Sequence, residues 1–127
     1  MRGVSIGDSC ESVFELERAQ GSRLKIDGRL KIFEVVHEGF PALVSYTCKD
    51  GKISIQTVNI SYSKDSEAKQ KIKDLEREYT NKYESSPDRD VDNDSAWLVW
   101  RSDKALVTVS ALYSGEGSEV YINHGAP

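Results

Sequence analysis

The sequence has few of the residues and patterns that mark specialised protein chemistry. Its 127 residues include two cysteines, two histidines, three prolines and one methionine. No CxxC pair, GxSxG, HExxH, P-loop or dinucleotide-binding glycine pattern occurs, which argues against the enzyme classes that those motifs define. Because the many carboxylates make chance proximity certain, no acid–base pair can be nominated either. We therefore expect a protein that is not an enzyme, with no catalytic residues and no cofactor.

Long apolar runs and concentrated basic charge are also missing. No run approaches the ~20 apolar residues that span a bilayer, and no secretory leader with an apolar centre is present. The net charge is −4, from 17 basic and 21 acidic residues. The only basic cluster is interleaved with acids, which is typical of a solvated helix face. We expect no transmembrane segment and no nucleic-acid partner.

The clearest pattern that is present lies between Ser63 and Tyr83. Apolar residues recur there at spacings of three and four, which places them on one stripe of a helix: Ala68, Ile72, Leu75, Tyr79 and Tyr83. Charged residues cover the other faces. The pattern predicts a long amphipathic helix at 64–83 on which a sheet packs.

A second, shorter helix is predicted from Ser9 to about Gln20. Asp8 is expected to cap it, with Glu11 completing a capping box and Gly21 in the left-handed position after its end. Its inward face carries four residues: Cys10, Val13, Phe14 and Glu17.

Alternating apolar residues predict six strands, at 29–36, 42–48, 52–62, 96–101, 104–113 and 119–123. A change of apolar phase in the third strand predicts a bulge or twist near Thr57, and Asp50-Gly51 predicts a tight hairpin. The order is helix, three strands, helix, three strands. We therefore expect a single α+β domain over 1–127, with a largely antiparallel meander sheet and flexible ends at 1–6 and 124–127.

Cys10 and Cys48 both point to apolar faces of neighbouring predicted elements. We expect a disulfide between them, closing a loop of about 38 residues and stabilising the fold by roughly 4 kcal/mol. The alternative is two buried free thiols in a cytosolic core. A redox or nucleophilic role is not expected.

Four aspartates alternate along a polar loop at 84–95: Asp88, Asp90, Asp92 and Asp94. They resemble the front of a calcium loop, but the EF-hand register fails because Ser95 replaces the glycine and Arg101 the bidentate glutamate. We interpret the segment as a solvated acidic loop. His37 and His124 have no ligand at metal-binding spacing, so no metal site is expected.

Segment 96–101 is apolar on both faces, which suggests a central strand. Both faces cannot be buried against one helix layer, so Trp97 or Trp100 lies under a loop or the first helix, or anchors an interface. The candidate protein-binding surface consists of the four aspartates with three aromatic residues: Trp97, Trp100 and Tyr113.

Two stretches resemble small bacterial envelope domains. The opening Gly3-Val4-Ser5-Ile6-Gly7-Asp8-Ser9 before a short helix is similar to the start of the outer-membrane-assembly lipoprotein group (SmpA/OmlA-like) and of β-lactamase-inhibitor-protein-like folds. Leu75, Tyr79, Lys82-Tyr83 and Pro87, leading to a tryptophan hairpin, resemble many secreted bacterial domains, although Glu84 replaces their usual glycine. The resemblance implies an extracytoplasmic, non-enzymatic domain that binds another protein.

Three functions are weighed on this basis. The first is a periplasmic or envelope protein-binding module, an accessory, inhibitor or immunity-type protein, although the chain opening also fits a cytoplasmic protein. The second is a carrier of a small ligand or lipid, with a pocket between helix and sheet lined by four aromatic residues: Phe14, Phe33, Tyr46 and Trp97. An enzyme would require His37 or His124 beside a carboxylate in a cleft.

Overall fold

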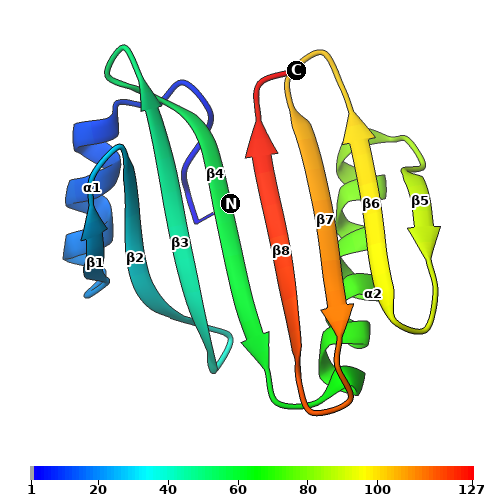
Figure 1. The fold of residues 1–127 in the computed structure, drawn as a ribbon. Coiled ribbons are helices and arrows are strands. Elements are labelled where there is room, and N and C mark those ends of the chain that lie inside the picture. Colours follow the sequence, from blue (N-terminus) through cyan, green and yellow to red (C-terminus); the bar gives the residue numbers. More distant parts are fainter. Residues whose placement is uncertain (1) are drawn as a thin grey trace.

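The chain forms an eight-stranded antiparallel sheet with two helices on one of its faces (Figure 1). The computed structural model describes residues 2–127. The helices are α1 (Cys10–Ala19) and α2 (Asp65–Tyr83). The strands are β1 (Arg23–Asp27), β2 (Leu30–His37), β3 (Phe40–Lys49), β4 (Lys52–Tyr62), β5 (Asp88–Val91), β6 (Ser95–Arg101), β7 (Leu106–Tyr113) and β8 (Ser118–Gly125).

The chain consists of two units of the same layout, each a helix followed by a four-stranded meander. The strand order is β1-β2-β3-β4-β8-β7-β6-β5. The last strands of the two units, β4 and β8, pair antiparallel with Val58 opposite Ile122. This pairing relates the halves by an approximate two-fold axis perpendicular to the sheet. The α+β class is confirmed, but the predicted order of helix and three strands, repeated, is wrong because each unit has four strands.

The two strands that the sequence did not predict are the edges of the sheet. All four residues of β5 are exposed, and β1 leaves all but Leu24 exposed. β5 has no apolar alternation by which to recognise it, and β1 has only Leu24, which packs against the core, and the exposed Ile26. β6 was expected to be central, but it lies next to the edge strand β5.

Both helices cover the same face of the sheet. Residues directly opposite each other on neighbouring antiparallel strands share a face. One such row across five strands is Tyr46, Gln56, His124, Val107 and Trp100. At one end of this row Phe14 of α1 packs on Tyr46, with ring centroids 6.3 Å apart; at the other, Tyr79 of α2 packs on Trp100 at 5.4 Å. The sheet therefore packs against two helices, and not on the long helix alone as predicted.

The helix starts differ from the prediction by one residue. Ser9, and not Asp8, is the N-cap of α1 and accepts a hydrogen bond from the backbone N–H of Ser12. The Asp8 carboxylate instead accepts one from Ser5 N–H at 2.9 Å. Helix α2 begins at Asp65 and not at 64, and the Asp65 carboxylate accepts a hydrogen bond from Gly115 N–H in the β7–β8 turn.

The turn predictions hold better than the bulge prediction. Asp50 and Gly51 both have positive φ, 54° and 75°, as a two-residue hairpin turn requires. Gly21 also has the expected left-handed conformation, with φ 83°. The register of β4 shifts between Ile53 and Ile55, ahead of the predicted position at Thr57.

The ends that were predicted to be flexible contain packed residues. Val4 is buried, and β8 continues through Gly125. Met1 lies outside the described residues. Within residues 2–127, neither helix is long and apolar enough to cross a membrane.

Candidate functional site

The face of the sheet opposite the helices is covered by no other element of the described chain, and we call it the open face. Its middle row across the sheet is Glu34, Leu43, Asn59, Tyr121, Ser110, Trp97 and Asp90. Solvent-facing sheet surfaces usually carry polar residues in alternation with a buried face. Here the alternation is incomplete, because apolar side chains are interspersed among the polar ones.

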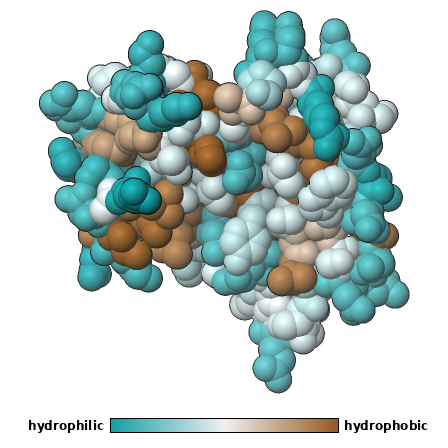
Figure 2. All heavy atoms as spheres, turned by 45° about the horizontal axis from the view of Figure 1, so that its top comes forward, coloured by the Kyte–Doolittle hydropathy of each residue, from teal (hydrophilic) through white to brown (hydrophobic). Residues whose placement is uncertain are grey.

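Most of the exposed large hydrophobic residues lie on the open face. The described chain exposes eight, and six of them are on this face: Ile26, Leu30, Val36, Ile55, Trp97 and Leu112. Val36 and Leu112 have the largest exposed fractions, 73% and 66%. In Figure 2, which views this face obliquely, the brown apolar residues form patches among polar ones, the largest over the first half of the sheet. Apolar surface gathered in this way marks sites of interaction.

A hollow of about 580 Å³ is present on the first half of the open face. Val36, Pro41 and Leu43 supply apolar walls, and Asn59 and Glu34 supply polar groups. The Oδ1 atom of Asn59 is buried without a hydrogen-bond partner among the described residues. Because a buried acceptor without a partner is costly, this atom is suited to accept an N–H or O–H from a bound molecule.

The second half of the open face carries excess negative charge beside its exposed apolar residues. Asp90 lies directly opposite Trp97, and Glu119 lies opposite Leu112. Neither carboxylate has a cationic partner within ion-pair distance in the described chain. Asp88 on the same half is paired with Arg101, and Glu34 on the first half is paired with Arg23 and Lys25. Glu119 accepts a hydrogen bond from the Tyr121 phenol at 2.7 Å, but neither Asp90 nor Glu119 has its charge balanced by a cation of the described residues. Both would favour basic groups on a bound molecule.

The predicted binding surface is only partly assembled. Trp97 is 43% exposed on the open face, with Asp90 opposite it. Trp100 is 2% exposed and packs under α2, so it belongs to the core and not to the predicted surface. Tyr113 lies on the helix-covered face, where the ammonium of Lys69 is 5.1 Å from its ring centroid.

The acidic loop is divided between a strand and a turn. Asp88 and Asp90 belong to β5, whereas Asp92 and Asp94 form the β5–β6 turn. The Asp92 carboxylate accepts backbone N–H bonds from Asp94 and Ser95, at 2.8 and 2.9 Å, which lower its pKa. In residues 2–127 no three His, Cys, Asp or Glu side chains gather so that they could hold a metal ion.

The two histidines meet different parts of the condition set for an enzyme. His37 Nε2 is 2.8 Å from the carboxylate of Glu38 on the β2–β3 turn, and burial lowers the pKa of the His37 imidazole. His124 lines a hollow, and the described lining of that hollow contains no carboxylate. Each histidine therefore meets one of the two conditions: His37 has a neighbouring carboxylate, and His124 lines a hollow.

The four aromatic residues proposed to line a carrier pocket are not brought together. Phe14, Phe33 and Tyr46 pack ring against ring, with centroids 6.1 to 6.3 Å apart. Trp97 lies on the opposite face of the sheet. The first three fill the space between α1 and the sheet and leave no shared pocket with the fourth.

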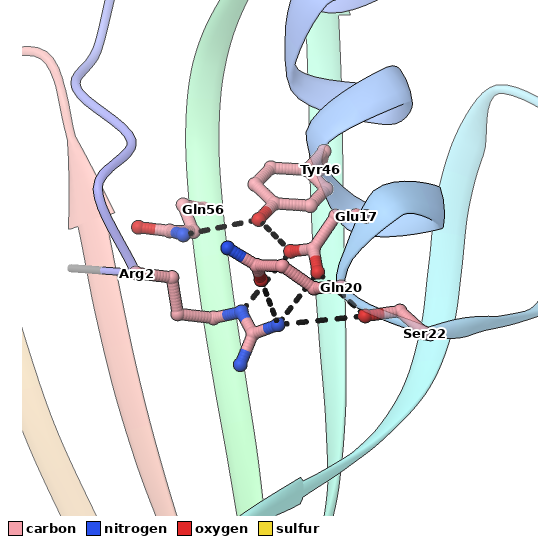
Figure 3. A network of polar contacts seen from close by, with 6 residues as sticks. All are labelled: Arg2, Glu17, Gln20, Ser22, Tyr46 and Gln56. Carbon is pink, nitrogen blue, oxygen red and sulfur yellow. Dashed lines mark hydrogen bonds and ion pairs between the residues drawn. The ribbon is translucent and has the colours of Figure 1, made fainter.

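A buried polar network fixes the N-terminal segment and α1 to the sheet (Figure 3). Glu17 accepts hydrogen bonds from Arg2 at 2.6 and 3.1 Å, from Ser22 at 2.8 Å and from the phenol of Tyr46. Burial alone would raise the pKa of Glu17, but these hydrogen bonds and the Arg2 charge outweigh it and lower the pKa. The sequence placed Glu17 on the inward face of the helix but gave no sign of its partner Arg2.

The two cysteines lie at disulfide distance, as predicted. The Cα atoms of Cys10 and Cys48 are 6.2 Å apart, and the bond joins the start of α1 to β3 across 38 positions of the chain.

Comparison with known proteins identifies no relative: no family model, no curated protein and no solved structure matches this chain. The resemblance to bacterial envelope domains stays a prediction, and the function has to be inferred from the structure itself.

Proposed function

We propose that this chain is a non-enzymatic module that binds another protein on the open face of its sheet. The observation that carries the proposal is the distribution of the exposed large hydrophobic residues in the described chain, because six of the eight lie on that one face. A surface that only faced solvent would gain nothing from Val36 and Leu112, whereas a bound protein would bury both.

The dimensions of the open face fit a protein better than a small molecule. Eight strands at about 4.8 Å spacing make a surface roughly 34 Å wide, and strands of about eight residues make it roughly 27 Å long. Its area of roughly 900 Å² is close to the ~800 Å² that each partner contributes to a stable protein–protein interface.

The charges on this face favour a partner with basic and apolar side chains. Asp90 and Glu119 stand beside Trp97 and Leu112 without cations of their own. A lysine or arginine of the partner would pair with them, and its N–H groups also suit the free acceptor of Asn59. A second copy of this chain fits less well, because it would bring the same unpaired carboxylates to the interface.

The compartment we propose is extracytoplasmic, in a bacterial envelope or secreted, where an accessory, inhibitor or immunity-type protein would act. The Cys10–Cys48 bond supports this, because disulfides persist mainly in oxidising compartments.

The test compares how well a partner protein is bound by a variant altered on the open face and by a variant altered on helix α1. The variant V36S/L112S removes the two most exposed apolar side chains of the open face, and L16S removes an exposed leucine on α1 as a matched control. Each is used to capture proteins from cytosolic and envelope fractions, and the captured protein is then purified for affinity measurement. We expect the wild type and L16S to bind one partner equally, and V36S/L112S to bind it about tenfold or more weakly.

Two results would overturn this proposal. One is a partner that binds V36S/L112S as tightly as the wild type. The other is a homodimer, measured by light scattering, that dissociates in V36S/L112S, since the open face would then pair two copies of this chain.

A further inference from the structure

A second hollow, of about 350 Å³, lies on the helix-covered side of the sheet, between the end of α2 and the N-terminal segment. Its sheet side is formed by Gln56 and His124, which are opposite each other on β4 and β8. Val4, Ile6 and Ala105 add apolar walls. In Figure 1 the N-terminal segment passes behind β4, between the two helices. This hollow is therefore on the other side of the sheet from the open face.

His124 is the most deeply buried ionisable residue that lines this hollow, with an exposed fraction of 7%. Its Nε2 atom is 3.2 Å from the phenol oxygen of Tyr79. Burial raises the pKa of Tyr79, so the phenol keeps its proton and can donate it to Nε2. The proton of the neutral imidazole is then on Nδ1, which has no hydrogen-bond partner among the described residues. His124 thus holds an N–H donor that the protein itself does not satisfy.

The charged groups around this donor are all basic. Lys82 comes from the last turn of α2 and Lys104 from the β6–β7 turn. Neither ammonium lies within ion-pair distance of a carboxylate in the described chain, and the Lys82 ammonium instead lies 5.6 Å from the Tyr83 ring centroid. Both lysines are exposed residues that line the hollow, so the hollow has two cations and no carboxylate in its described lining, in a chain of net charge −4.

We propose that this hollow binds a small organic carboxylate. The carboxylate would lie between Lys82, Lys104 and the Nδ1–H group of His124, because each offers a donor and two offer charge. The apolar part of the ligand would rest on Val4 and Ile6. The volume of about 350 Å³ is within the ~300–1,000 Å³ of ligand pockets and restricts the ligand to a small one.

The ligand can be tested with simple carboxylates and their neutral isosteres. Benzoate and hexanoate are titrated into the full chain at neutral pH by calorimetry, with benzamide and hexanamide as controls. We expect both carboxylates to bind and both amides to bind at least about tenfold more weakly. NMR should show a higher pKa for the His124 imidazole in the presence of benzoate, because the bound anion stabilises the imidazolium beside Lys82 and Tyr79.

Charge variants locate the site. K82Q/K104Q removes both lysines of the hollow, and K49Q/K73Q makes the same change in net charge at two lysines that are also exposed but lie outside the hollow. We expect the first to weaken benzoate binding about tenfold at unchanged melting temperature, and the second to leave it unchanged. The proposal is overturned if neither carboxylate binds, if the amides bind equally, if K82Q/K104Q binds like the wild type, or if only inorganic phosphate binds. None of these outcomes depends on the open face.

Discussion

The carboxylate of Glu17 on α1 accepts a hydrogen bond from the phenol of Tyr46 on β3, and Glu17 is only 1% exposed between the helix and the sheet. A buried carboxylate is tolerated only where charges and hydrogen bonds replace its water. Arg2 supplies the charge, and Gln56 donates to the Tyr46 oxygen at 3.3 Å. The network therefore joins the N-terminal segment, the first helix and the centre of the sheet.

The first prediction concerns this network. We expect E17Q to lower the free energy of unfolding by about 2 kcal/mol at neutral pH, because the charge-assisted hydrogen bonds from Arg2 are lost while the side-chain volume is kept. Urea unfolding measures the change. E15Q removes an exposed carboxylate from the same helix and should stay within about 0.5 kcal/mol of the wild type.

The pKa of Glu17 determines how the difference in unfolding free energy between the wild type and E17Q changes with pH. The folded pKa of Glu17 is lowered, so its stabilising contribution is present above the pKa of an unfolded glutamate and is lost as the pH falls through the folded pKa. The difference in unfolding free energy between the wild type and E17Q should therefore become smaller as the pH is lowered. A difference that stays constant from neutral to strongly acidic pH would contradict the assignment.

The sequence predicted the elements that bury one face and missed the two short edge strands, β1 and β5, which are almost entirely exposed. Helix α2 and strands β3, β4 and β7 carry a clear apolar period, and their bounds agree with the prediction to within two residues. β5 has a single apolar residue, Val91, and forms because β6 offers it an unpaired backbone edge. Edge strands of this kind are specified by tertiary contacts and not by local pattern.

The second prediction concerns the disulfide. Without reductant, the denatured protein should show no reactive thiols, and after reduction it should show two, from Cys10 and Cys48. The double variant C10A/C48A should lose roughly 4 kcal/mol of unfolding free energy, because a loop of 38 positions is no longer closed in the unfolded chain. Two reactive thiols before reduction would exclude the bond and with it the main support for an oxidising compartment.

The third prediction separates the two tryptophans. Trp100 is 2% exposed and contacts Tyr79, so W100A should destabilise the fold by about 3 to 5 kcal/mol, whereas W97A should change it by about 0.5 kcal/mol or less. Tryptophan fluorescence provides a direct check. The emission of W100F, which retains Trp97, should be quenched by acrylamide more strongly than that of W97F. Equal quenching would contradict the placement of the two residues on opposite faces.

The candidate site was less predictable than the fold. Alternation indicates which residues share a face but not which face a helix covers. The sequence therefore could not tell which of Trp97 and Trp100 is buried, and the structure places Trp100 under α2. Nor does the sequence show that His124, Lys82 and Lys104 meet. All three come from the second unit, and their proximity depends on the pairing of β7 with β8 and on the packing of α2 against these strands. The β4–β8 pairing adds Gln56 of the first unit to the same hollow.

The fourth prediction concerns the titration of His124. Burial and the nearby charge of Lys82 lower its pKa from 6.5 to about 4, and NMR of the imidazole protons in ligand-free protein should show this value. Because the unfolded chain takes up a proton near pH 6.5 and the folded chain does not, the stability that depends on neutral His124 is present above pH 6.5 and is lost as the pH falls towards 4. The loss amounts to about 3 kcal/mol over this range. H124Q lacks this group, so its stability should decline less than that of the wild type over the same range. An imidazole that titrates near 6.5, or an H124Q variant with the same decline as the wild type, would show that His124 is not held neutral between α2 and the sheet.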